Sequence, residues 1–220
     1  MHSARFAVID TETTGLDPAR DRVVSLAVVP IDGGAVRQER SVHILIDPGV
    51  PIPHQSTAIH GIADADVRGA PDLPAALRMA APELAGRIVV GHNLPFDLAF
   101  LSRSGFAPAQ TLDTRAISRV LWPQRRSRHS LDALAARVGV TPRDRHTALG
   151  DAVATAETLA ACLPLLAARG LDSPAAVAAA YEAQQIRRAR LRRSIRRRSI
   201  RHRTVLTHRS RPRRSMPRPR

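Results

Sequence analysis

Apolar residues in the first fifty positions occur in short runs rich in valine, isoleucine and alanine, separated by polar and turn-forming residues. Three such runs occupy residues 5–9, 23–29 and 42–46, and Pro30 follows the second. Runs of this length and composition predict β-strands. The Asp-Gly-Gly sequence at residues 32–34 is a turn signal. Three strands with short connections predict an antiparallel meander whose second strand is broken at Pro30.

Beyond residue 70 the apolar positions recur with helical spacing, as in Leu94, Leu98 and Leu101. Short apolar stretches at residues 87–90 and around Leu112 predict two further strands. Strands that alternate with helices predict an α/β fold whose sheet holds both antiparallel and parallel pairs. The segments predicted to be helical are residues 72–86, with a break near Pro82, 95–103, 114–121, 130–138, 147–169 and 173–186.

Charge divides the chain into two parts. All 34 basic residues are arginines, and the formal net charge is +15. Residues 187–220 hold 16 arginines and no acidic residue, whereas residues 1–186 hold 18 arginines and 19 acidic residues. We therefore expect a near-neutral domain, residues 1–186, and an Arg-rich, largely disordered basic tail, residues 187–220. The near-neutral body excludes a basic structural protein of the ribosome or nucleoid.

Two questions about the tail stay open at the level of sequence. An apolar stripe through Ile186, Leu191 and Ile195 allows the last helix to continue to about residue 198, and order is not expected from residue 199 onward. The tail is either a solvated extension without a role or an arm that holds nucleic acid through its phosphates.

Cysteine content and hydropathy bear on the location of the protein. Cys162 is the single cysteine, so an intramolecular disulfide cannot form, which fits a reducing cytosol. It lies on the apolar face of a predicted helix, which favours a buried, inert thiol. No apolar run approaches the roughly 20 residues needed to span a bilayer. The sequence thus predicts a cytoplasmic protein without a membrane partner.

The first candidate chemistry is a pair of carboxylates at the end of the first predicted strand. Asp10 and Glu12 are two residues apart, so a strand directs both side chains to the same face. Two like charges on one face repel unless a cation lies between them, and oxygen ligands suit Mg²⁺ or Mn²⁺. The alternative is a solvated strand end that leads into a turn.

Two further segments place polar residues after predicted strands or at predicted helix starts. Asp97 follows the buried strand at 87–90 and falls in the first turn of a helix, either as a third carboxylate at the sheet edge or as a partner of the helix dipole. His146 and Asp151 are five residues apart, a step that does not stack them on one helical face. His146 is therefore expected on the loop before a helix and Asp151 in its first turns, the alternative being a loop histidine and a capping aspartate.

Together these segments resemble the DEDD-type 3′–5′ exonucleases of the histidine subclass, the DnaQ-like group that includes the proofreading epsilon subunit of bacterial DNA polymerase III. The resemblance covers about residues 5–168 and rests on three motifs in the right order and spacing. Position 147 is threonine, where many members have arginine. The segments that carry the resemblance are Asp10-Thr11-Glu12-Thr13-Thr14-Gly15-Leu16, Ile59-His60-Gly61-Ile62, Gly91-His92-Asn93-Leu94-Pro95-Phe96-Asp97, Asp113-Thr114 and His146-Thr147-Ala148-Leu149-Gly150-Asp151-Ala152.

The resemblance implies a fold and a set of site residues. The fold would be an RNase H-like five-stranded mixed sheet, with three antiparallel and two parallel strands, flanked by helices. Two divalent ions, Mg²⁺ or Mn²⁺, would be held directly by Asp10, Glu12 and Asp151, with Asp97 partly through water, and His146 would be the general base. The residues expected to bind substrate are Thr13, Thr14, Gly15, Gln55, His60 and Asn93.

The activity that this resemblance implies is removal of nucleoside 5′-monophosphates from the 3′ end of single-stranded or frayed DNA, in proofreading or repair. A DNA polymerase subunit is the protein partner that it suggests. Two alternatives stay open: a 3′–5′ exoribonuclease that trims RNA, and a non-catalytic, polymerase-associated subunit that binds nucleic acid.

Overall fold

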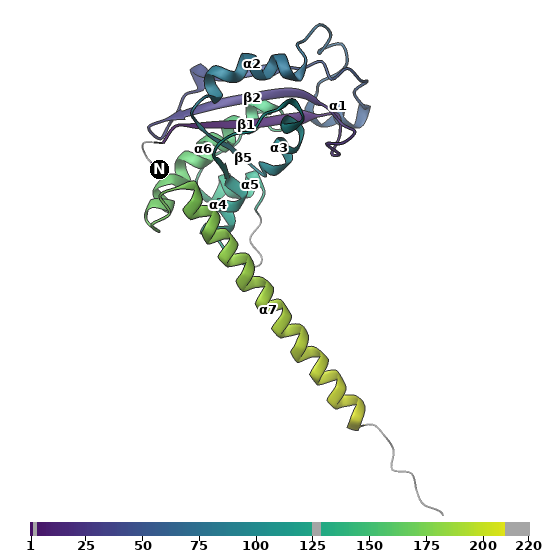
Figure 1. Ribbon diagram of the computed structural model, residues 1–220, viewed down its shortest axis with the longest axis vertical. Coiled ribbons are helices and arrows are strands. Elements are labelled where there is room, and N and C mark those ends of the chain that lie inside the picture. The colour runs from purple at the N-terminus through teal and green to yellow at the C-terminus, as the bar shows by residue number, and fades with distance from the viewer. Residues whose placement is uncertain (2–3, 125–128, 210–220) are drawn as a thin grey trace, which may run out of the picture. The chain divides into compact units, whose positions relative to one another are not determined.

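The computed structural model describes residues 1, 4–124 and 129–209, with side chains described as far as residue 191 (Figure 1). The chain divides into two units, Met1–Ala179 and Ala180–Arg220. The sheet, its covering helices and the motif segments found in the sequence all belong to the first unit.

One mixed sheet forms the centre of the first unit, in the order β3-β2-β1-β5-β6, and β4 also pairs with β2. The β1–β2, β2–β3 and β2–β4 pairs are antiparallel, and the β1–β5 and β5–β6 pairs are parallel. The predicted mixed α/β sheet is confirmed, with six strands instead of five because the turn at Gly33 and Gly34 adds the two-residue β3. The strands are β1 Phe6–Thr13, β2 Val23–Asp32, β3 Ala35–Val36, β4 Val42–Leu45, β5 Ile88–Gly91 and β6 Thr111–Asp113.

Strand β2 continues through Pro30, so the predicted break there is wrong. Pro30 is paired with Ala7 of β1, and its carbonyl accepts a hydrogen bond from the backbone N–H of Arg37 at 2.9 Å. The nitrogen and carbonyl of a strand residue point to the same side. The nitrogen of Pro30 therefore faces away from β1, toward the β3 side, where the missing N–H interrupts no β1–β2 hydrogen bond.

The predicted helices are present with small shifts of their ends, except that the last one extends well beyond residue 186. Helix α1 was not predicted. Pro82 does not break α2, which ends two residues later at Leu84. Pro82 lies exposed in the last turn, where the carbonyl that loses its partner can bond to water. The helices are η1 Gln38–Arg40, α1 His54–His60, α2 Leu73–Leu84, α3 Pro95–Leu101, η2 Ser102–Ser104, α4 Thr114–Leu121, α5 Leu131–Arg137, α6 Ala148–Ala167 and α7 Pro174–Arg209.

Alternation along β1 builds a core on both faces of the sheet. Phe6 and Val8 pack with the buried face of α6, whereas Ala7 and Ile9 pack with residues of α2 and α3. Figure 1 shows α2 over one side of β1 and β2 and α6 on the other. This alternation continues past the apolar part of the strand, so it also decides which way the polar residues that follow must point.

By length and hydropathy α6 could cross a membrane, so the expectation that no segment meets this criterion is wrong. Ten of the 20 residues of α6 are buried. Leu159, Cys162 and Leu166 lie in the core against the sheet, and burial raises the pKa of the Cys162 thiol to about 12. In the described part of the chain α6 is a core helix, and its apolar length follows from burial in the protein.

Helix α7 extends from Pro174 to Arg209, past the position 186 at which the sequence predicts a domain boundary. The sequence predicts disorder from residue 199 onward, but the helix continues to Arg209. Residues 210–220 lie outside the described residues. Alanine, glutamine, leucine and arginine have high helix propensity, which accounts for a helix in a segment with little apolar surface. The division into an exonuclease-like domain and a separate basic tail stays a prediction.

Candidate active site

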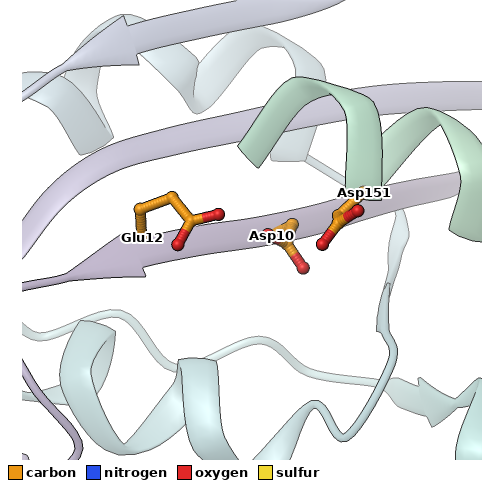
Figure 2. A group of neighbouring side chains, drawn as sticks. All are labelled: Asp10, Glu12 and Asp151. Atoms are coloured by element: carbon orange, nitrogen blue, oxygen red, sulfur yellow. The ribbon is translucent and has the colours of Figure 1, made fainter. Parts of the chain in front are cut away.

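Two strand residues and one helix residue bring three carboxylates together. Asp10 and Glu12 continue the series of Phe6 and Val8 on β1, so they point to the side of the sheet that α6 covers. Asp151 lies in the first turn of α6, whose N-cap Thr147 accepts a hydrogen bond from the N–H of Gly150 at 3.1 Å. Carboxylate oxygens of the three residues lie within 4.8 Å of one another, and Figure 2 shows them converging from β1 and α6.

Asp97 of α3 is hydrogen-bonded to the same strand, β1, through Thr11. It is 4% exposed in the first turn of α3. Its Oδ1 accepts hydrogen bonds from the backbone N–H of Thr11 at 3.1 Å and from the Thr11 hydroxyl at 2.7 Å. Thr11 lies between Asp10 and Glu12, so Asp97 is held next to the three-carboxylate cluster without being a member of it.

Three carboxyl groups, those of Asp10, Glu12 and Asp97, have a raised proton affinity. Burial, followed by the charges of Asp97 and Glu12, raises the pKa of Asp10 well above its ordinary value. Burial and the charge of Asp97 raise the pKa of Glu12 to about 7, and burial raises that of Asp97 to about 7 against its hydrogen bonds from Thr11. These carboxylates resist ionisation because they are crowded together and shielded from solvent. A divalent cation bound among them would stabilise their ionised form, so the site is a suitable environment for such an ion. The donor set thus fits use of a divalent metal ion.

Arg145 is a member of the site that the sequence reasoning missed. Its guanidinium forms an ion pair with Asp151. It also donates hydrogen bonds to Asp132 on α5, from Nε to Oδ1 at 2.7 Å and from Nη2 to Oδ2 at 3.4 Å. Its charge lowers the pKa of Asp10 and Glu12. The sequence offers one signal for it, a basic residue directly before His146.

His146 lies on the loop before α6, as predicted, and is exposed. Its φ is 64°, and that of Asp144 is 48°, a left-handed conformation that costs a non-glycine residue about 1–3 kcal/mol. The hydroxyl of Thr147 donates to the carbonyl of Asp144 at 2.7 Å, and a Cβ on Gly150 would collide with that same carbonyl. The loop is therefore held closely against the first turn of α6 while the imidazole stays in solvent.

The loop after β5 is held by neighbouring side chains. Asn93 has a φ of 71°; its N–H donates to Oδ1 of Asp113 at 2.9 Å, and its Oδ1 accepts from Arg115 at 2.8 Å. The substrate-binding role of Asn93 stays a prediction, and its side-chain oxygen already accepts this hydrogen bond from Arg115. Beside the loop is a pocket of about 420 Å³. It is lined by Asp10, His92, Arg115, Arg119, His129, Ser130, Leu131, Arg145 and Asp151.

The other predicted substrate residues gather where β1 ends. The hydroxyl of Ser56 on α1 donates to the carbonyl of Thr14 at 2.8 Å, which attaches α1 to the segment Thr13–Gly15. His60, at the end of α1, is 6% exposed, and its Nδ1 accepts from the N–H of Ile62 at 3.1 Å. Burial lowers its pKa. Gln55 lies exposed on the same helix. These residues are near one another, and their role in binding stays a prediction.

Comparison with known proteins identifies the family of this arrangement. Residues 7–159 match the model of a family described as exonuclease. The chain belongs to the exonuclease family. The resemblance to DnaQ-like 3′–5′ exonucleases is thereby confirmed, and the acidic cluster of β1 and α6 lies within the matched residues.

Among curated proteins, the chain is 44% identical over 180 residues to a DNA polymerase III subunit epsilon-like protein of Rhodobacter capsulatus. It is 36% identical over 161 residues to a PolC-type DNA polymerase III of Lacticaseibacillus paracasei. These alignments cover 78% and 70% of the chain but only 25% and 11% of the relatives. The exonuclease-family segment therefore corresponds to a small part of each of those longer proteins.

Solved structures give the same fold. Exonuclease X in complex with 5′ overhanging duplex DNA matches with a TM-score of 0.64 and 27% identity, over 80% of this chain and 99% of that one. Escherichia coli exonuclease I in complex with a dT13 oligonucleotide matches with a TM-score of 0.61 at 18% identity, over 76% of this chain and 43% of that one. The second likeness shows the shared fold alone.

Proposed function

We propose that the protein is a metal-dependent 3′–5′ exonuclease that hydrolyses the terminal phosphodiester of single-stranded or frayed DNA and releases nucleoside 5′-monophosphates. The observation that carries the proposal is the convergence of Asp10, Glu12 and Asp151 within 4.8 Å, with Asp97 held beside them. Membership of the exonuclease family supports the reaction class.

In this proposal two divalent ions, Mg²⁺ or Mn²⁺, are held by Asp10, Glu12 and Asp151, with Asp97 contributing to the second. When bound, such ions neutralise the carboxylates and stabilise the charge that develops on the phosphodiester oxygens. His146 accepts the proton of the attacking water. Its exposed position on a loop suits this role, because the imidazole can approach a substrate that lies over the carboxylates.

The segment Thr13–Gly15, together with Gln55, His60 and Asn93, is proposed to hold the terminal nucleotide. DNA is favoured over RNA as substrate because the similar exonuclease X was solved in complex with duplex DNA, and the sequence relatives are a DNA polymerase III subunit epsilon-like protein and a PolC-type DNA polymerase III. The same relatives support association with a DNA polymerase subunit and a cytoplasmic location as parts of the proposal.

The test uses the full-length protein and end-labelled single-stranded DNA and RNA, with Mg²⁺, Mn²⁺ or EDTA, and products sized at single-nucleotide resolution. Loss of single nucleotides from the 3′ end of DNA, abolished by EDTA, is the expected result. Faster degradation of RNA would favour the exoribonuclease.

Three variants test the residues. Asp10→Ala, Glu12→Ala and Asp151→Ala should each abolish turnover while the protein stays folded, because each removes an oxygen ligand. Glu39→Ala, which removes an exposed carboxylate far along the chain from the motifs, is the matched control and should keep the parent rate. A parent rate in any of the three would contradict the assignment, and inactivity of all of them and the parent would favour the non-catalytic binding subunit.

A further inference from the structure

Arg145 lies between two carboxylates that have different surroundings. On one side its guanidinium forms an ion pair with Asp151, a member of the three-carboxylate cluster. On the other it contacts Asp132 of α5, whose side chain is 65% exposed. The Arg145 side chain itself is 25% exposed. The guanidinium is therefore a cation at the edge of the same group of oxygens that is proposed to coordinate divalent ions.

This contact conflicts with coordination of a metal ion by Asp151. The guanidinium of Arg145 occupies the side of the Asp151 carboxylate from which a divalent ion would have to approach. Two cations in one site repel each other. Asp132 offers Arg145 a second partner outside the cluster, at 2.7 and 3.4 Å. The side chain can thus leave Asp151 without losing all its ionic contacts.

The backbone on both sides of Arg145 is also constrained. Asp144 and His146 both have left-handed φ values, 48° and 64°. Because Arg145 is between them, its contacts with Asp132 and Asp151 restrain the same short loop that carries the proposed general base. A movement of the Arg145 side chain would therefore act on the loop that carries His146.

We propose that Arg145 is a positioning residue that acts as the internal counter-ion of the carboxylate cluster and competes with the divalent ion for Asp151. In the metal-free protein it holds the carboxylates together and fixes the loop at residues 144–146. On coordination of the ion it moves to Asp132 alone, which releases this loop. The inference rests on the proposed metal-dependent function, and it adds a residue that sets metal affinity.

The test is calorimetric titration of the full-length protein with Mn²⁺ in the absence of nucleic acid, at about pH 8.5, above the ordinary range of carboxyl pKa values. Arg145→Gln removes the competing charge and should bind Mn²⁺ about tenfold more tightly than the parent, a coupling of ordinary size. Arg145→Lys keeps the charge and should stay close to the parent. Arg143→Gln removes an exposed arginine two residues away, and serves as the matched control with an unchanged Kd.

Equal Mn²⁺ affinity in the parent and Arg145→Gln, or weaker affinity in the variant, would overturn the proposal. The same is true if Arg143→Gln tightens binding equally, because net charge would then be the cause. Thermal melts in EDTA confirm that each variant is folded, and Arg145→Met, which keeps the aliphatic stem, replaces the glutamine variant if that one does not fold. The titration is independent of nuclease activity: a parent that binds Mn²⁺ but does not cut DNA refutes the proposed function, while the comparison of Kd values still decides the role of Arg145.

Discussion

Replacing Glu12 by glutamine should stabilise the metal-free protein, and by an amount that depends on pH. Burial and the charge of Asp97 raise the pKa of Glu12 from 4.5 to about 7 in the folded protein. A folded-state pKa above the unfolded one means that Glu12 favours folding when protonated. This contribution is complete below about pH 4.5 and is lost as the pH rises through about 7. Glutamine stays neutral and avoids the loss.

The size of the effect follows from the same values. The gap between 4.5 and about 7, at about 1.4 kcal/mol per pKa unit, corresponds to at most about 3.4 kcal/mol in the free energy of unfolding. Glu12 is half-buried, and solvent screening reduces this to about 2 kcal/mol. At pH 8 the Glu12→Gln variant should therefore melt about 4–8 °C above the parent, and at pH 5 the difference should fall to about a third of that.

The assay is thermal unfolding in EDTA at pH 5 and pH 8, followed by the same melts with Mg²⁺. Glu39→Gln, which neutralises an exposed acid, should show no such pH dependence. Added Mg²⁺ should stabilise the parent more than Glu12→Gln, because the variant has lost one oxygen ligand. The reasoning is refuted if Glu12→Gln destabilises the metal-free protein at pH 8, or if its effect is the same at both pH values.

Three further changes test other parts of the molecule. His146→Ala should lower kcat by about 10²–10⁴-fold while Mn²⁺ affinity measured by calorimetry is kept, because a general base is lost and no ligand is removed. Gly150→Ala should destabilise the protein by about 1–3 kcal/mol in denaturant melts and lower kcat, because the new methyl group collides with the carbonyl of Asp144. Truncation after Ile186, which removes 16 arginines, should raise KM and flatten its salt dependence with kcat nearly unchanged.

Each of these has a clear contrary outcome. Weaker Mn²⁺ binding by His146→Ala, with chemistry little changed, would make the histidine a ligand. Parent stability and rate in Gly150→Ala would show that the loop does not depend on close contact with α6. Identical salt slopes of the full-length and truncated proteins would leave the basic segment without a role in binding, and a large loss of kcat would mean that it supports the fold or the site.

Local rules were sufficient for several parts of this protein. The alternation of side chains along a strand was enough to place Asp10 and Glu12 on one face, because the period of two does not depend on the rest of the fold. Helix spacing and capping signals located α4 and α5 to within a residue at each end. The five-residue step from His146 to Asp151 was enough to put the histidine on a loop and the aspartate in the first turn of α6.

Tertiary structure decided what those rules do not reach. Nothing in the chain near Asp97 indicates that its carboxylate is held by Thr11, because that contact depends on the parallel pairing of β1 and β5, which joins segments about eighty residues apart. Pro30 disrupts no β1–β2 hydrogen bond because its nitrogen faces away from β1. Which neighbour a strand residue faces is decided by the pairing of the strands in the sheet, and the sequence of one strand does not reveal it. The ion pairs of Arg145 with Asp132 and Asp151 exist because α5 and α6 pack together. Sequence spacing indicates which residues can share a face, but only packing determines which charges meet.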